Sequence, residues 1–155
     1  MKRYSFILIP VLLLSLLGSC ISIKMKHSLP SENFVERMDI CKKIDETGEL
    51  FEPLEVLTEF TSEDSHVICF VKLKDVASQI GLQWKWYSPE EKMVRDTGKV
   101  IVNQDRKFLE AVTAYDLFKI TPENIIEGQW TVVILVDDKF IGRKTFQLRK
   151  KANEN

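Results

Sequence analysis

The feature that most restricts the fold is a series of short β-branched and aromatic runs, separated by turn-forming residues at roughly every 8–12 positions. Leu82, Trp84 and Trp86 alternate with polar residues, and this period of two is typical of a strand with one buried face. The run 66–73 is almost wholly apolar and rich in β-branched residues, as expected of a central strand. The pattern predicts an all-β chain.

The expected strands can be placed between the turn signals. They cover residues 35–45, 54–60, 66–73, 82–86, 92–96, 99–103, 109–120, 128–136 and 140–149. The fifth and sixth of these are either two short strands or one bent strand. Residues 109–120 contain Leu, Glu and Ala, which favour a helix, but the neighbouring segments favour a strand, and we predict a strand. About seven to nine short strands with regular turns predict an antiparallel β-sandwich.

Three motifs follow one another in the second half of the chain. They are Trp84-Lys-Trp86-Tyr-Ser-Pro89, Gly128-Gln-Trp130-Thr-Val-Val and Gly142-Arg-Lys-Thr-Phe146. Their order resembles the immunoglobulin-like domains of bacterial envelope proteins, and the resemblance covers residues 36–149. It implies an immunoglobulin-like sandwich. Antibody-type domains bridge the sheets with a disulfide around the tryptophan, but residues 130–136 contain no cysteine, so we expect that bridge to be absent.

The N-terminus carries the features of an export signal. Lys2 and Arg3 precede an apolar run over residues 6–17, which is too short for a membrane-spanning helix of about 20 residues. The run ends at Leu17-Gly-Ser-Cys20, which resembles the bacterial lipobox: an aliphatic residue, two small residues and a cysteine. The resemblance implies a cleaved signal peptide over residues 1–19 and a lipidated Cys20. Ordinary cleavage and an uncleaved anchor are the alternatives.

The lipobox sets the expected location and partners. A lipidated protein would be held at the cell envelope, and Ile21 after the cysteine favours the outer membrane if the source has one. Residues 20–35 then form a tether, residues 36–149 the domain and residues 150–155 a disordered tail. Removing residues 1–19 takes away two basic side chains, leaving 20 basic and 23 acidic, a net charge of −3. This argues against a nucleic-acid partner.

Two cysteines remain once Cys20 carries lipid. Cys41 and Cys69 are an even pair in a compartment that can be oxidising, so a disulfide between them is one alternative. The other is two separate, half-buried thiols. Cys41 is expected on the strand face opposite Met38 and Ile40, whereas Cys69 shares the inward face of its strand. These facings disagree unless a bulge or an edge position reconciles them.

Catalytic, metal and cofactor motifs are absent from the sequence. There is no Gly-x-Ser-x-Gly, phosphate loop or His-Glu-x-x-His. Ser65 and His66 are adjacent, and neighbouring residues of a strand point to opposite faces, so we expect that they do not pair. The acidic pairs fall in predicted turns, where we expect solvated carboxylates. We therefore expect no enzyme activity, no cofactor and no metal site.

Binding remains as the expected function. The tryptophans could stack on sugars if exposed, but their alternation places them in the core, which leaves Tyr87 and Tyr115 as better candidates for exposed contacts. Sheet edges and the connections 74–81 and 121–128 could dock a protein. The sequence favours a non-catalytic module that binds another envelope protein. The alternatives are a surface-exposed module for host or extracellular ligands, including glycans, and a cryptic hydrolase.

Overall fold

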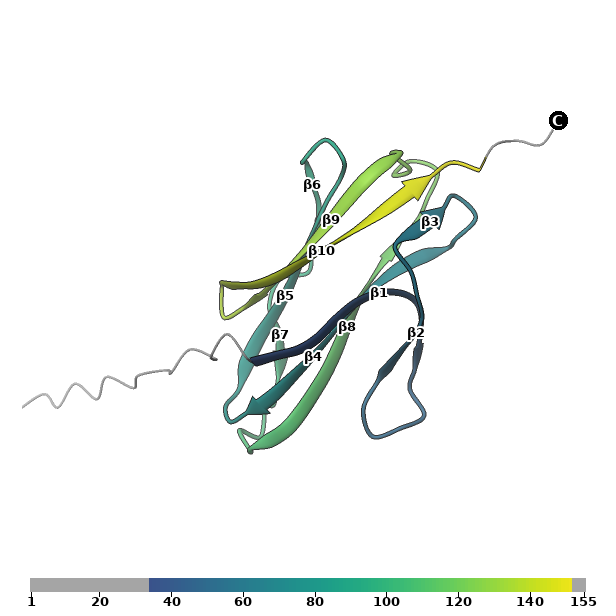
Figure 1. The fold of residues 1–155 in the computed structure, drawn as a ribbon. Coiled ribbons are helices and arrows are strands. Elements are labelled where there is room, and N and C mark those ends of the chain that lie inside the picture. Colours follow the sequence, from purple (N-terminus) through teal and green to yellow (C-terminus); the bar gives the residue numbers. More distant parts are fainter. Residues whose placement is uncertain (1–33, 152–155) are drawn as a thin grey trace, which may run out of the picture.

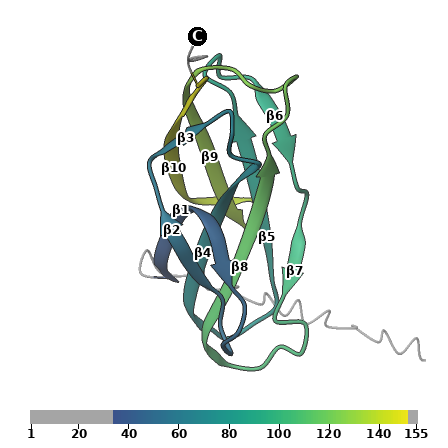
Figure 2. The same ribbon diagram turned by 90° about the vertical axis from the view of Figure 1, so that its right-hand side faces the viewer.

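The computed structural model describes residues 34–151, which form two β-sheets packed face to face (Figures 1 and 2). The expected signal peptide, Cys20 and the expected tether up to residue 33 lie outside the described residues, as do residues 152–155 of the expected tail. The described part contains no helix that is long and apolar enough to cross a membrane.

Ten strands are present in the described residues. They are β1 (Val35–Asp45), β2 (Glu52–Val56), β3 (Glu59–Thr61), β4 (His66–Val76), β5 (Ile80–Tyr87), β6 (Met93–Asp96), β7 (Val100–Val102), β8 (Leu109–Lys119), β9 (Gly128–Val136) and β10 (Lys139–Arg149). The all-β prediction is confirmed, with ten strands rather than seven to nine.

The strand order is that of an immunoglobulin-like sandwich. One sheet has the order β2-β1-β4-β8, and the other has the order β3-β10-β9-β5-β6 with β7 also paired to β5. With β1, β4 and β8 as strands A, B and E, and β5, β9 and β10 as C, F and G, the two sheets have the strand orders A-B-E and C-F-G of that fold, and no described strand takes the place of D beside β8. The pairing is antiparallel throughout, except that β3 runs parallel to β10.

The single strand expected over residues 54–60 is wrong. The segment forms β2 in one sheet and β3 in the other. The change occurs between two neighbouring residues: the Leu57 amide donates to the Ile40 carbonyl at 3.0 Å, while the Thr58 carbonyl accepts from the Gln147 amide at 2.8 Å. Because consecutive backbone groups bond to different sheets, the chain crosses the edge of the sandwich here.

The strand pairing settles the structure of the two segments that the sequence left ambiguous, residues 92–103 and residues 109–120. β6 and β7 both pair with β5, one at each end, and the Thr97 amide between them donates to the Trp84 carbonyl at 3.1 Å. They therefore act as one bent edge strand. The segment expected over residues 109–120 is β8, and it pairs with β4 from Leu109 to Lys119. Pairing with a buried strand outweighs the helix preference of its residues.

The core between the sheets is dominated by aromatic side chains. Trp84, Trp86 and Trp130 are each at most 2% exposed, which confirms that they are core residues. The ring of Trp86 stacks on Phe118 at 5.3 Å between centroids, and Trp130 stacks on Phe146 at 6.2 Å. Such pairs stabilise a fold beyond the area they bury.

The four-stranded sheet also buries apolar side chains on its outer face. Cys41, Ile68 and Phe70 form this outer cluster, and Phe51 and Tyr115 pack against it. The connection between β1 and β2 folds over the cluster: the Phe51 amide donates to Thr113 Oγ1 at 2.9 Å, and the Tyr115 hydroxyl donates to Glu46 at 2.5 Å. Since both faces of β4 are covered, the nearly continuous apolar run of this strand is explained.

Candidate functional site

Cys41 and Cys69 do not face each other. Both are free and fully buried. In the register of β1 and β4, Cys41 lies opposite Ile68 and Cys69 lies opposite Ile40, so the two thiols point to opposite faces of the sheet. Cys69 belongs to the core between the sheets and Cys41 to the outer cluster.

Burial also makes both thiols poor nucleophiles. Loss of solvation raises the pKa of Cys41 to about 11, and the nearby charge of Asp39 adds to this shift. Loss of solvation likewise raises the pKa of Cys69. A thiol reacts as its thiolate, so neither cysteine is suited to covalent chemistry at neutral pH.

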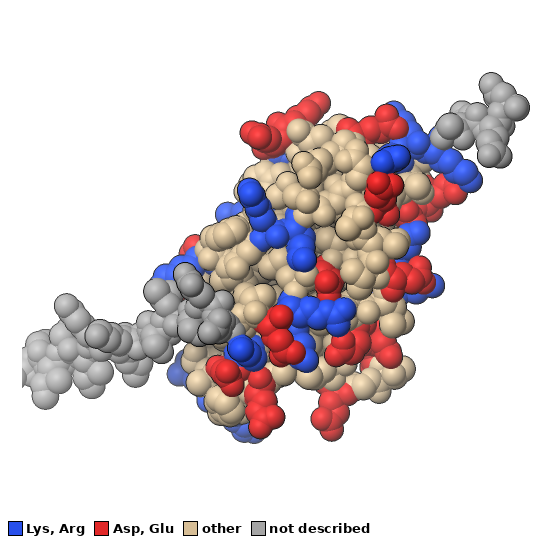
Figure 3. Space-filling view, viewed as in Figure 1, with Lys and Arg blue, Asp and Glu red and all other residues tan. Residues whose placement is uncertain are grey.

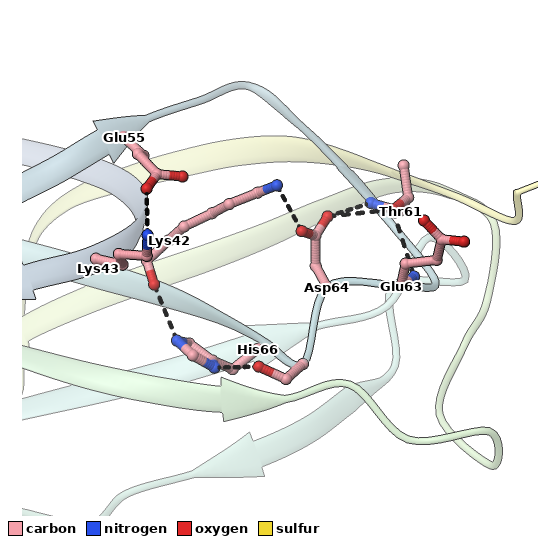
Figure 4. A network of polar contacts seen from close by, with 8 residues as sticks. Lys42, Lys43, Glu55, Thr61, Glu63, Asp64 and His66 are labelled. Atoms are coloured by element: carbon pink, nitrogen blue, oxygen red, sulfur yellow. Dashed lines mark hydrogen bonds and ion pairs between the residues drawn. The ribbon is translucent and has the colours of Figure 1, made fainter.

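The expectation that Ser65 and His66 do not pair is wrong. Ser65 Oγ lies 2.7 Å from His66 Nδ1, and His66 Nε2 lies 2.9 Å from the carbonyl oxygen of Lys42 (Figure 4). Ser65 precedes the first residue of β4, so its backbone does not follow the pleat that separates neighbouring side chains. A carbonyl oxygen only accepts hydrogen bonds, so Nε2 carries a proton, and in the neutral imidazole Nδ1 then accepts from the Ser65 hydroxyl.

Asp64 does not complete a catalytic triad with this pair. Its carboxylate faces Lys42 Nζ at 2.5 Å and accepts from the Thr61 amide at 2.7 Å, away from His66 (Figure 4). Burial raises the pKa of the Asp64 carboxyl, but the hydrogen bonds from Lys42 and Thr61 outweigh it and hold the pKa below its ordinary value. The network joins the loop before β4 to β1. Its geometry is that of a structural brace.

A second arrangement lies on one side of the sandwich, where β8 and the bent β6–β7 strand form the edges of the two sheets (Figure 2). We call this surface the open side. β8 has eleven residues and pairs with β4 alone among the described strands, so its second edge is unpaired there. Opposite it, four apolar side chains of the β6–β7 strand are exposed: Met93, Val94, Val100 and Ile101.

A charged clasp crosses the open side. Arg95 of β6 donates to both oxygens of Asp116 on β8, from Nη2 at 2.7 Å and from Nε at 3.0 Å. The buried indole of Trp86 donates to the same carboxylate at 2.7 Å. The Asp116 side chain is only 11% exposed, so its charge is satisfied mainly by these donors.

Sequence reasoning did not identify the clasp. Its signal is a break in the alternation of β8, in which Val112, Ala114 and Phe118 face the core and Asp116 occupies the same face. A carboxylate in an apolar alternation requires a partner, and the partner cannot be found from local sequence because Arg95 lies in the other sheet.

Tyr87 and Tyr115, which the sequence suggested for exposed contacts, differ in how accessible they are. Tyr115 packs edge-on against Phe51 and donates to Glu46, so it belongs to the cover of the outer cluster. Tyr87 is half-buried on β5, opposite Met93 and Thr131. Basic and acidic side chains are interspersed over the face seen in Figure 3, which shows no continuous patch of one charge.

No protein-family model and no curated protein matches the chain. Among solved structures, it is similar to an immunoglobulin-like protein from Pseudomonas aeruginosa at 15% identity, covering 76% of this chain and 95% of that one, with a TM-score of 0.47. An alkylpurine DNA glycosylase from Pseudomonas fluorescens matches at 9% identity over 59% of this chain and 27% of that one, with a TM-score of 0.41.

A third similar structure is a β-glucosidase from Kluyveromyces marxianus, at 13% identity over 72% of this chain and 14% of that one, with a TM-score of 0.39. This chain thus spans only a small part of the two enzymes. Likenesses this distant carry no information about function, and the fold is assigned here from the strand order.

Proposed function

We propose that this chain is a lipid-anchored, non-catalytic interaction module of the bacterial cell envelope, and that it binds another envelope protein. The anchor is supported by Leu17-Gly-Ser-Cys20, which follows a basic start and a short apolar run. Two or three acyl chains on Cys20 would hold the protein firmly, since one chain alone gives only marginal binding. The outer membrane is the favoured address if the source has one.

The open side carries the interaction part of the proposal. Four exposed apolar side chains lie on the β6–β7 strand, and the same side presents the unpaired edge of β8. Single exposed apolar residues are ordinary, but four of them along one edge strand, beside the free edge of the other sheet, favour contact with a partner that covers this edge. A free edge can also add a strand from a partner through backbone hydrogen bonds.

Site-specific photo-crosslinking in cells tests this surface. A photoreactive residue at Val94 or Ile101 is expected to capture a discrete envelope protein, and the same residue at Lys144, on β10, is expected not to. Val100 and Ile101 point to opposite faces of β7, so a partner that covers this edge contacts both faces, and Val100→Asp should reduce capture from position 101 by placing a charge at the same edge. Capture that is equal from position 144 would contradict the proposal. Binding to a glycan array in place of a protein would favour the alternative of an extracellular ligand.

The anchor has its own test. Cys20→Ala is expected to abolish fatty-acid labelling and to leave the precursor unprocessed by the lipoprotein peptidase. Cys41→Ala is the matched control, because Cys41 is buried in the domain and should not affect labelling. Unchanged labelling of the Cys20→Ala variant would rule the assignment out.

A hydrolase is the second candidate, and the contact between Ser65 and His66 favours it. A neutral imidazole that accepts from a serine hydroxyl while its other nitrogen donates to a carbonyl has the tautomer that a general base needs. Turnover of an ester substrate that is lost in both Ser65→Ala and His66→Ala would establish this activity. We expect no turnover, because Asp64 is committed to Lys42 and Thr61.

A further inference from the structure

The two most exposed large apolar side chains of the described residues are Phe108 and Phe140, at 62% and 63%. Phe108 lies in the connection just before β8, and Phe140 is the second residue of β10, directly after the turn between β9 and β10. Neither packs in a core cluster. Exposing two phenylalanine rings to water is unfavourable. The position of the rings in the fold and the residues beside them therefore indicate which apolar environment they would enter.

Both side chains lie at the same end of the sandwich. Leu109, next to Phe108, pairs with Val76 at the end of β4. The Asp137 amide in the β9–β10 turn donates to the Gly81 carbonyl near the start of β5, at 2.9 Å. β4 and β5 are joined by a short turn over residues 77–79, which brings the two connections to one end.

The described chain also begins at this end. Val35, the first residue of β1, pairs with Leu73 of β4, close to Val76. Figure 1 shows β1 starting beside the β9–β10 hairpin, while the chain leaves the opposite end at β10. We call the end formed by the start of β1, the β4–β5 turn, the β7–β8 connection and the β9–β10 turn the tether end.

Each exposed phenylalanine directly follows an exposed lysine. Lys107 precedes Phe108, has a side chain that is 76% exposed and lies 3.7 Å from Asp105, and the exposed Lys139 precedes Phe140 and follows Asp137 and Asp138. An aromatic ring beside an ammonium group suits the boundary between lipid headgroups and acyl chains. The ring enters the apolar layer while the lysine extends to the phosphates.

We propose that Phe108 and Phe140 insert into the headgroup region of the membrane that holds the lipid anchor, so that the tether end faces the bilayer. This inference rests on the proposed lipidation of Cys20. Fourteen residue steps separate Cys20 from Phe34, and a chain of that length spans at most about 50 Å. The anchor therefore keeps the domain within about 50 Å of the lipid surface, and insertion of the two rings sets which end faces the bilayer.

In this orientation the open side of the sandwich faces sideways, along the plane of the membrane. The β6–β7 and β8 edges run along the length of the sandwich (Figure 2). Val100 and Ile101 pair with Leu82 and Gly81, next to the tether end, whereas Met93 pairs with Tyr87 at the other end of β5. A partner in the envelope can then reach Met93 and Val94 laterally, at the end of the open side that points away from the lipid.

Depth-dependent quenching of a fluorescent label tests the inference. The processed, lipidated protein is reconstituted in vesicles of phosphatidylethanolamine and phosphatidylglycerol, with an environment-sensitive label on Phe108→Cys or Phe140→Cys. Cys41 and Cys69 are buried and should not take the label in the folded protein. Lys92→Cys, in the turn at the opposite end, and Met93→Cys, on the open side, are the control positions.

A blue shift of emission and quenching by doxyl-labelled lipid are expected at positions 108 and 140, and neither is expected at position 92 or 93. The inference would be overturned by equal quenching at all four positions or by stronger quenching at position 92 or 93. It would also be overturned if the protein floats with the vesicles but shows no quenching at any position. Protein that does not float with the vesicles would contradict the lipid anchor, and the inference fails with it. The flotation assay therefore distinguishes failure of the anchor from failure of the inserted rings.

A second variant separates insertion from simple proximity. With the label on Lys139→Cys, the double substitution Phe108→Ser and Phe140→Ser should reduce quenching, while Met93→Ser should leave it unchanged. All three side chains are exposed, so the fold should tolerate these changes. Quenching that is unaffected by the double substitution would show that the rings do not hold the domain at the membrane, and would overturn the inference.

Discussion

Arg95 and Asp116 form a bidentate ion pair that joins the two sheets of the sandwich across its open side. The residues lie on the edge strands β6 and β8, and the carboxylate also accepts from the indole nitrogen of buried Trp86. The hydrogen bond to Asp116 raises the pKa of Arg95. The clasp therefore ties the surface proposed for binding to the centre of the core.

Removing the carboxylate should weaken the domain measurably. Asp116→Ala leaves the Trp86 indole nitrogen without an acceptor in a buried site, which costs about 1–3 kcal/mol of unfolding free energy. Glu59→Ala is the matched control, because its pair with Arg149 is exposed on both sides and should contribute less than about 1 kcal/mol. Urea unfolding of both variants measures the difference. Equal losses would show that the clasp is no stronger than a surface ion pair.

The thiols should remain reduced and unreactive in the folded domain. Cys41 and Cys69 point to opposite faces of one sheet, and burial raises the pKa of both. We expect the intact mass of the dithiol under non-reducing conditions, no alkylation of the native protein, and alkylation of both thiols in denaturant. A mass lower by two hydrogen atoms would establish a disulfide and contradict the register of β1 and β4.

The sequence predicts the strands best where polar turns bound an apolar run. β1 and β9 occupy the residues expected of them, 35–45 and 128–136. The crossing near Thr58 was not predicted, because local sequence does not say which sheet will accept a backbone hydrogen bond. The alternation of side chains along each strand predicts that Cys41 and Cys69 face opposite ways but leaves a disulfide open through a bulge or an edge position, and in the register of β1 and β4 the two thiols point to opposite faces.

The candidate sites likewise separate into features that local sequence predicts and features that depend on tertiary contacts. The alternation rule failed for Ser65 and His66 because it applies only within a strand, and Ser65 lies just outside one. The clasp could not be predicted because its two residues pair across sheets. Phe108 and Phe140 were expected neither in the core nor at a site. Their shared position depends on the β4–β5 turn, which brings two distant connections together.

Stability should fall as acid protonates Asp64. Its carboxyl pKa is lower in the folded protein than the ordinary value of 3.8, so the unfolded chain binds protons first as the pH drops. The stabilisation from Lys42 and Thr61 is present above the unfolded pKa and is lost as the pH falls from about 5 through the folded pKa.

The measurement is the unfolding free energy of the protein and of Asp64→Asn across that pH range. The variant lacks the titrating group, so its stability should depend less steeply on pH. Glu63→Gln, whose ion pair with Lys151 is largely exposed, is the control and should keep the slope of the original protein. Parallel curves for all three proteins would contradict the assigned role of Asp64.

Gly128, the first residue of β9, should tolerate no side chain. Its φ of +133° is a conformation that L residues rarely adopt, and a β-carbon there would lie 2.9 Å from Cβ of Pro89. Pro89 is in the turn after β5, so the start of β9 packs against the start of the β5–β6 connection. Gly128→Ala therefore combines backbone strain with a steric clash and should cost at least about 1–3 kcal/mol.

The matched control is Gly48→Ala, since Gly48 lies in the exposed connection between β1 and β2 and its nearest contact would be 3.4 Å away. Its unfolding free energy should change by less than about 1 kcal/mol. The double variant Gly128→Ala with Pro89→Gly should recover part of the loss relative to the sum of the two single variants, because Cβ and Cγ of Pro89, which meet the new β-carbon, are both removed. If the pair shows no recovery, the strain at Gly128 comes from its backbone alone and not from the contact with Pro89.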